Sequence, residues 1–297
     1  MTVYFDFSVF TSPYFNTSVL VYALVVGILT GICASALGVN LVLKRYSMIG
    51  DGLSHVGFLA LAVAALLGIT GESVMYITVP VVTAAAFLLM WLSESGKLKG
   101  DAATALVSVG TVAAGYVVFS LANAGSGDIC AGLFGASILT LKSTDLVFCV
   151  AVTLAVMVLY IAFYNKIFAV TFDEAFAKST GINTKGFNLL LSVLTAVTIV
   201  VGMKLIGSIM ISAVIVIPAI TAMRITKRFR SVVICSVLLS VVCYVLGFLF
   251  AVTFVIEKSG PIAQTIMLPV GATIVCFNVI VLLIVCAIGG VKKKIKA

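Results

Sequence analysis

Charged residues are scarce in this chain. Only 9% of its 297 residues are charged, whereas 63% are hydrophobic, and the mean hydropathy is +1.31. Soluble domains have about 25% charged and about 45–50% apolar residues, so this composition excludes a water-soluble surface. The apolar stretches also lack the in/out alternation of a lipid-facing barrel strand. The chain is therefore predicted to be an integral membrane protein built from spanning helices.

Several motifs are also missing. None of the seven cysteines stands in a CxxC pair, so we expect them to pack as small apolar residues rather than bind a metal. No GxxxxGK[ST] loop occurs, so any work driven by ATP needs another subunit. The first residues lack the basic start of a cleaved signal peptide, so the first span is expected to stay in the mature protein.

Long apolar runs predict a single all-α domain over residues 1–297, a polytopic transmembrane bundle of eight or nine spans. The sixth and seventh runs touch at Gly207, either as two spans with a tight turn or as one span plus a broken helix. A further stretch, 130–141, is too short to cross and is expected to re-enter or lie at the interface. The predicted spans are 19–43, 53–69, 74–92, 103–124, 143–164, 187–203, 205–223, 231–256 and 262–288.

Cationic residues predict the orientation of these spans. Fifteen of the eighteen fall in loops on one side and three on the other, so the first side is predicted to be cytoplasmic, the N-terminus external and the C-terminus cytoplasmic. The basic clusters are interpreted as topology signals and lipid contacts, not as nucleic-acid grooves. The larger set is Lys44, Arg45, Lys97, Lys99, Lys166, Lys178, Lys185, Arg224, Lys227, Arg228, Arg230, Lys292, Lys293, Lys294 and Lys296; the smaller is Lys142, Lys204 and Lys258.

The only histidine, His55, follows Asp51 by four residues at the start of an apolar run. Residues four apart share a helix face, so a carboxylate oxygen and an imidazole nitrogen point the same way. Ionisable groups in a span are costly and usually face a polar cavity, which makes this pair the predicted metal site. If a helix runs inward from Arg45, His55 lies about 15 Å deeper, near the midplane. Gly50 and Gly52 either open the helix locally or permit close packing.

Two ligands do not complete a metal site. Met48 lies on the same face and either adds a thioether or packs. If two copies of the chain meet around an axis, the combined oxygens and nitrogens suit Zn²⁺, or Mn²⁺ or Fe²⁺ with added water. The alternative is a polar pair hydrogen-bonded inside the bundle with no ligand.

A second constellation predicts a short amphipathic helix on the cytoplasmic side, over 173–181. Asp173 and Glu174 complement a helix N-terminus, while Lys178 and Gly181 complement its C-terminus. About two turns of helix are not stable alone in water, so this segment needs a partner surface or is an ordinary interfacial loop helix.

A third constellation begins at Gly207 and ends near Pro218. Ser208 and Ser212 share a helix face, and Pro218 removes one backbone hydrogen bond. These serines either line a path or are structural. In the first span, Gly27 and Gly31 form a GxxxG motif that predicts close helix packing.

These constellations, in this order, resemble the membrane permease subunit of bacterial zinc, manganese or iron ABC importers. The matching stretches are LVLKRYSMIGDGLSHVGFLALAVA at 41–64, DEAFAKSTGI at 173–182 and KLIGSIMISAVIVIPAITAMRI at 204–225. The resemblance covers roughly residues 18–288. The first stretch is the most specific, and the second resembles the coupling helix by which such permeases dock on their ATPase.

The resemblance implies a multi-pass protein of the bacterial cell membrane that is a transport subunit and not itself an enzyme. It implies two permease copies, identical or different, two cytoplasmic ATPases and an external metal-binding protein. Asp51 and His55 would form the intramembrane site for a transported ion, with no tightly bound cofactor. Glu174, Ala175 and Gly181 would belong to the coupling contact. Histidine-poor loops favour Mn²⁺ or Fe²⁺ slightly without excluding Zn²⁺.

Two other functions fit parts of the pattern. In a secondary transporter, Asp51 and His55 would relay protons and no ATPase would be needed. A permease for a metal chelate, such as vitamin B12 or a siderophore, would use the same machinery with a larger cavity. The bare carboxylate and imidazole favour a naked ion.

Overall fold

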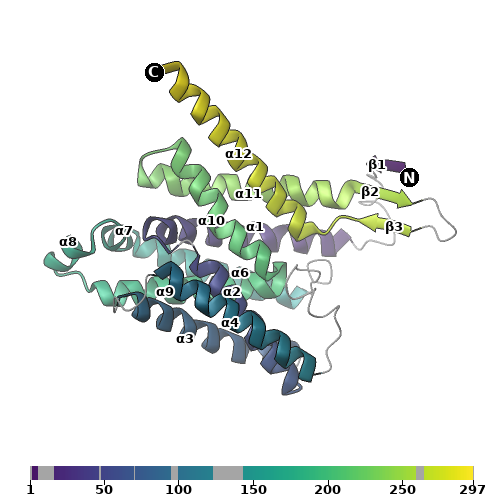
Figure 1. The fold of residues 1–297 in the computed structure, drawn as a ribbon, viewed down its shortest axis with the longest axis horizontal. Coiled ribbons are helices and arrows are strands. Elements are labelled where there is room, and N and C mark those ends of the chain that lie inside the picture. The colour runs from purple at the N-terminus through teal and green to yellow at the C-terminus, as the bar shows by residue number, and fades with distance from the viewer. Residues whose placement is uncertain are drawn as a thin grey trace.

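Apolar stretches of about the length needed to cross a bilayer form the helices of this chain. The computed structural model describes residues 2–5, 17–46, 48–69, 71–94, 100–122, 143–258 and 264–296 (Figure 1). Its helices are α1 (Thr17–Leu43), α2 (Ile49–Leu66), η2 (Gly71–Val74), α3 (Met75–Glu94), α4 (Gly100–Leu121), α6 (Ser143–Ala162), α7 (Tyr164–Phe172), α8 (Glu174–Ser179), α9 (Thr184–Ile206), α10 (Ser208–Ile225), α11 (Phe229–Thr253) and α12 (Val270–Lys296).

The described helices agree with the predicted multi-pass bundle. Seven of them, α1, α2, α4, α9, α10, α11 and α12, are long and apolar enough to cross a membrane. The bent pair α6–α7 provides an eighth candidate span, and α3 contains a shorter apolar stretch, Tyr76–Leu89. The helix-bundle prediction is confirmed; the described residues give seven candidate spans, or eight with the bent pair, against the eight or nine predicted. The predicted re-entrant stretch 130–141 lies outside the described residues.

A single glycine separates the sixth and seventh predicted spans. Gly207 has φ +99°, a backbone conformation that residues with a Cβ rarely adopt, and its N–H donates to Met203 O. Helix α9 ends just before it and α10 begins just after it. The two helices contact each other. Of the two alternatives left open by the sequence, the structure therefore shows two helices joined by a tight turn.

Helix α1 lies among α6, α7, α9, α10 and α11. Its glycines allow the closest approaches: a Cβ on Gly27 would lie 1.7 Å from the Tyr244 ring, and one on Gly38 would lie 1.9 Å from Ile215 O. Ser240 of α11 donates to Gly31 O at 3.2 Å. The close packing predicted for the Gly27 and Gly31 motif is confirmed, with α11 as the partner helix.

A small antiparallel sheet at one end of the bundle was not predicted. Its strands are β1 (Thr2–Phe5), β2 (Phe254–Lys258) and β3 (Gln264–Met267), in the order β1-β2-β3. Thr2 of β1 pairs with Glu257 of β2, although the two residues are far apart in the sequence. The spans predicted over 231–256 and 262–288 are therefore corrected: α11 ends at Thr253 and α12 begins at Val270, because strands occupy the apolar residues between them.

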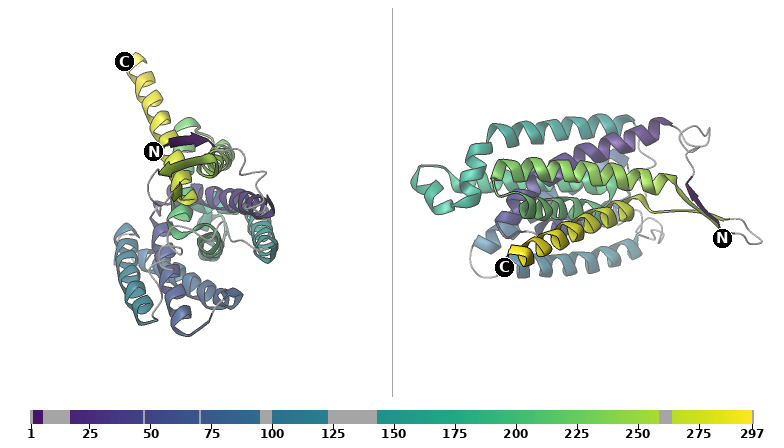
Figure 2. Two further views of the ribbon diagram at one scale, coloured as in Figure 1. Left: turned by 90° about the vertical axis from the view of Figure 1, so that its right-hand side faces the viewer. Right: turned by 90° about the horizontal axis from the view of Figure 1, so that it is seen from above.

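The segment predicted to form a short cytoplasmic helix, 173–181, lies at the opposite end of the bundle from this sheet. Helix α7 bends away from α6 by 69°, and α8 follows it (Figure 1). The view from above shows α7 and α8 projecting at one end, with β1 and β2 at the other (Figure 2).

Candidate metal site

The predicted metal ligands lie in the first two turns of α2. The helix begins directly after Met48, whose carbonyl accepts from Gly52 N–H at 3.0 Å. Asp51 is in the first turn, where the helix dipole favours a negative charge. His55 follows one turn later on the same face, and its Nε2 lies 3.5 Å from Asp51 Oδ1. The local prediction of a shared face is thus confirmed.

The separation of these two atoms suits a shared metal ion better than a direct hydrogen bond. Nitrogen–oxygen hydrogen bonds cluster near 2.9–3.0 Å. Two ligand atoms that are each about 2.1 Å from a tetrahedral ion lie about 3.4 Å apart. The Asp51 side chain is 43% exposed and that of His55 is 19% exposed, so an ion can approach them from outside this chain.

The other imidazole nitrogen of His55 is unsatisfied. His55 Nδ1 is buried and has no hydrogen-bond partner among the described residues. A buried polar atom without a partner costs about 1–3 kcal/mol, and this atom is not the nitrogen that lies next to Asp51. Across the described part of the chain, no group of three or more His, Cys, Asp and Glu side chains gathers to hold a metal. The described part of one chain therefore offers only two candidate ligands here, Asp51 and His55.

The predicted depth of His55 needs correction. The chain forms a turn after Arg45 and α2 starts only at Ile49, so His55 is six residues, or about 9 Å, into its helix. Helix α2 also runs without interruption through Gly50 and Gly52. A Cβ on Gly52 would lie 2.7 Å from Thr104 Cγ2 of α4, so this glycine serves close packing rather than a local opening.

Ser208 and Ser212 of α10 differ in their contacts with α2 and in their burial. Ser212 Oγ donates to Ser208 O at 2.8 Å and lies 3.2 Å from Ser54 Oγ, next to His55 in sequence. Ser54 in turn donates to Asp51 O at 2.7 Å. The structure therefore brings Ser212 to the metal-ligand helix, whereas Ser208 is fully buried. Met48 is half exposed at the start of α2.

The predicted short helix is present as α8. Asp173 precedes it and accepts from Phe176 N–H at 2.9 Å, and Gly181 ends it with φ +82°. Glu174 accepts from Asn188 Nδ2 of α9 at 3.0 Å through Oε1. Ala175 is exposed. These four residues thus form one compact unit, although their contact with an ATPase stays a prediction.

The sequence did not predict which residues would bond to Ser54 and Asn188. Ser54 and Asn188 are polar residues inside apolar runs, and such residues usually find hydrogen-bond partners. That signal marks them as interacting without naming a partner. Both partners, Ser212 and Glu174, lie on other helices.

Comparison with known proteins gives the family of this chain. Residues 16–288 match the ABC 3 transport family. The chain is 29% identical to the high-affinity zinc uptake system membrane protein ZnuB of Haemophilus influenzae, over 82% of this chain and 91% of that protein. It is 26% identical to the manganese transport system membrane protein MntC of Halalkalibacterium halodurans, over 82% of each chain.

Solved structures share the fold. PsaBC from Streptococcus pneumoniae, in complex with Fab, superposes with a TM-score of 0.74 at 26% identity over 90% of both chains. An inward-facing putative metal-chelate type ABC transporter superposes with a TM-score of 0.68 at 15% identity, which shows the fold alone. The predicted resemblance to permeases of metal ABC importers is confirmed, and the chain belongs to the ABC 3 transport family.

Proposed function

We propose that this permease moves a divalent transition metal ion, Mn²⁺, Zn²⁺ or Fe²⁺, into the cytoplasm, with Asp51 and His55 as its ligands along the path. The observation that carries the proposal is the 3.5 Å separation of Asp51 Oδ1 and His55 Nε2 on one face of α2. A carboxylate and an imidazole suit these ions. The zinc and manganese systems of the relatives support the same class of substrate.

The ion is bound between two permease copies. One chain offers two ligand atoms, whereas these metals take four or more. Asp51 is partly exposed, so its carboxylate is open to a symmetry-related copy. Two ligands per chain hold an ion weakly until the copies meet, which suits a cargo that must also leave. The proposal predicts one bound ion for each pair of chains.

ATPase subunits drive the cycle through α8. Phe176 of α8 is 62% exposed and Phe172 just before it is 57% exposed. This end of the bundle is cytoplasmic in the orientation predicted from the basic loops. An exposed apolar pair at the end of α7 and on α8 there fits a protein partner. An external metal-binding protein would deliver the ion at the opposite end, where the sheet lies.

The test is metal uptake by cells at limiting external Mn²⁺ or Zn²⁺, with Asp51→Asn and His55→Ala. Both variants should lose uptake while reaching the membrane in wild-type amounts. Met48→Leu is the matched control on the same helix face, and retained uptake there limits the ligands to Asp51 and His55. Wild-type uptake in both ligand variants would remove the pair from the path.

A second measurement separates this proposal from proton-coupled transport. Purified chain alone is placed in liposomes under a pH gradient, and the complete complex is placed in liposomes with ATP. The proposal expects Mn²⁺ or Zn²⁺ accumulation only with the complex and ATP. Accumulation driven by the pH gradient alone would instead assign Asp51 and His55 to a proton relay.

A further inference from the structure

Asn188 of α9 joins two charged residues from distant parts of the chain. Its side chain is buried, with 3% exposure. Asn188 Oδ1 accepts from the Lys44 ammonium at the end of α1, and Asn188 Nδ2 donates to Glu174 Oε1 of α8 at 3.0 Å. An ammonium only donates and a carboxylate only accepts, so the amide has one orientation that satisfies both. These three residues are called the amide bridge below.

The Lys44 end of the bridge belongs to a hydrogen-bonded turn between α1 and α2. Tyr46 N–H donates to Leu41 O and Arg45 N–H to Val42 O, the pattern of a Schellman helix end. Arg45 provides the left-handed residue of this motif, with φ +61°. Ile49 N–H then donates to Tyr46 O, so the first residue of α2 is bonded directly to the turn.

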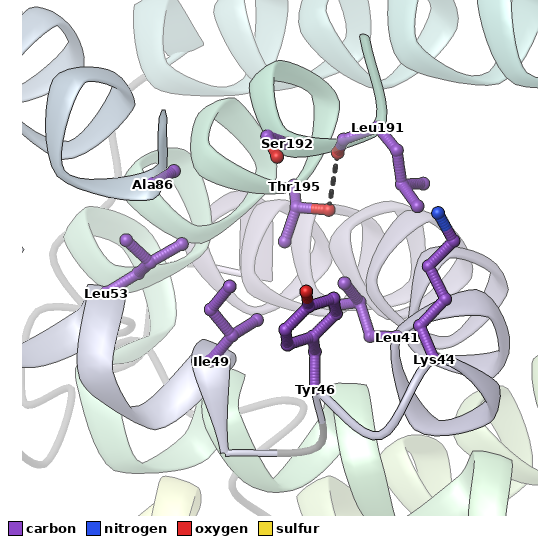
Figure 3. A pocket seen from close by; sticks show the side chains of 9 residues that line it. All are labelled: Leu41, Lys44, Tyr46, Ile49, Leu53, Ala86, Leu191, Ser192 and Thr195. Atoms are coloured by element: carbon purple, nitrogen blue, oxygen red, sulfur yellow. Dashed lines mark hydrogen bonds between the residues drawn. The ribbon is translucent and has the colours of Figure 1, made fainter. Parts of the chain in front are cut away.

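Side chains continue this connection. Leu41, Tyr46, Ile49 and Leu53 line a small hollow together with Leu191, Ser192 and Thr195 of α9 (Figure 3). Figure 3 also shows Lys44 extending from the α1 side of the hollow toward α9. The start of α2 is therefore seated on the same helix that carries Asn188. Asp51 follows Ile49 by two residues.

A second buried amide, that of Asn40 one turn earlier on α1, bonds this helix to α6 and α7. Asn40 is fully buried; its Nδ2 donates to Tyr160 Oη of α6 at 2.9 Å, and its Oδ1 accepts from Thr171 Oγ1 of α7 at 3.3 Å. Asn40 and Lys44 are four residues apart and share a face of α1. Helix α7 is thus bonded directly to α1 through Asn40, whereas α8 is connected to Lys44 only through Asn188 of α9.

We propose that Asn188 is a positioning residue that carries movement of α8 to the α1–α2 turn, and through it to Asp51 and His55. This inference rests on the proposed function, because it needs an ATPase that moves α8. When α8 shifts, Glu174 pulls the amide, Lys44 follows, and the bonded turn moves the start of α2. The bridge thereby links ATP hydrolysis to the exposure of the ion.

The first experiment compares two asparagines in the complete complex, in liposomes with ATP and Mn²⁺ or Zn²⁺. Asn188→Ala breaks the bridge. Asn183→Ala is the matched control, because Asn183 is exposed and only accepts from Gly186 N–H at the start of the same helix. Asn188→Ala should raise the ATP hydrolysed per imported ion by at least about fivefold, the lower end of typical coupling effects. Asn183→Ala should leave this ratio at the wild-type value.

The second experiment exchanges the charges at the two ends. Lys44→Glu alone leaves the Asn188 amide between two acceptors, and Glu174→Lys alone leaves it between two donors. In the double variant Lys44→Glu/Glu174→Lys, a half-turn of the Asn188 amide restores both bonds, because its oxygen and nitrogen change places. The double variant should recover the wild-type ratio of ATP to ions, even where a single variant folds poorly.

The outcomes are distinguishable. If the wild-type complex couples ATP to ion import and Asn188→Ala keeps the wild-type ratio, the bridge is only structural and this inference is overturned alone. Failure of the folded double variant to improve on both single variants overturns it as well. If the wild-type complex imports no ion with ATP, the proposed function fails and the inference falls with it.

Discussion

The metal pair and the amide bridge are both polar clusters in an apolar bundle, but they are satisfied to different degrees. Asp51 and His55 lie 3.5 Å apart, and His55 Nδ1 has no partner among the described residues. Asn188 uses both ends of its amide in hydrogen bonds to two charged residues. Under the proposed function Asp51 Oδ1 and His55 Nε2 have only each other before an ion arrives, whereas the Asn188 amide is bonded at both ends.

The two regions also differ in how far apart their members lie in the sequence. The metal pair spans one turn of one helix, so local geometry alone positions it. The amide bridge joins α1, α8 and α9 and exists only when the bundle is assembled. A substitution in the first region should therefore change ion binding with coupling geometry intact, and a substitution in the second should do the reverse.

The largest effect is expected for His55→Ala. Removing the imidazole deletes one of two ligands per chain, so ion affinity should fall by more than about 100-fold, since changes that only orient a ligand already cost about 10- to 100-fold. Metal analysis of the purified complex measures this. Asn188→Ala, assayed beside it, should keep the bound ion. Loss of the ion in both variants to the same extent would abolish the distinction between the two regions.

Glu174→Lys should affect coupling and leave ion binding unchanged. The lysine places a second donor against Asn188 Nδ2, so ATP hydrolysed per imported ion should rise by about fivefold or more. Glu174→Gln is the control, because its amide oxygen still accepts from Asn188. Melting of the purified permease checks that the bundle stays folded. Unchanged coupled hydrolysis in the lysine variant would contradict both docking and the bridge.

Gly52→Ala tests how closely α2, the helix that carries Asp51 and His55, packs against α4. The new Cβ would lie 2.7 Å from Thr104 Cγ2, so α2 and α4 must separate, and the free energy of unfolding should fall by about 1–3 kcal/mol. Gly110→Ala is the matched control on α4, because nothing lies within 4 Å of its added Cβ. Thermal melting in detergent compares them. Equal melting temperatures would show that the α2–α4 contact is looser than described.

The smallest effect is expected for Arg45→Gly, in the turn between α1 and α2 that follows Lys44. Arg45 has φ +61°, which costs a residue with a Cβ about 1–2 kcal/mol. Glycine removes this strain but loses about 0.5–1 kcal/mol more chain entropy on folding, so the free energy of unfolding should rise by about 1 kcal/mol at most. Arg45→Ala loses the same charge and keeps the strain, which makes it the control. Melting curves of the two variants measure the difference. A less stable glycine variant would contradict the strain assigned to Arg45.

Much of this fold followed from local patterns. Apolar runs predicted the helices, and Gly207 marked the break between two of them. Asp173 and Gly181 predicted the two ends of α8, because caps are read from neighbouring residues. The sheet escaped prediction, since β1 finds its partner strand only at the far end of the chain.

The sequence by itself determined a membrane-spanning helical bundle with a carboxylate and an imidazole on one face of a helix, because hydropathy and the period of the α-helix act over a few residues. The tertiary structure alone decided that Asn188 bonds Lys44 and Glu174 and that Ser212 meets Ser54. Lys44 carried only a topology signal in the sequence. Its partner is a buried amide on another helix, and such a contact arises from packing between helices rather than from any local pattern.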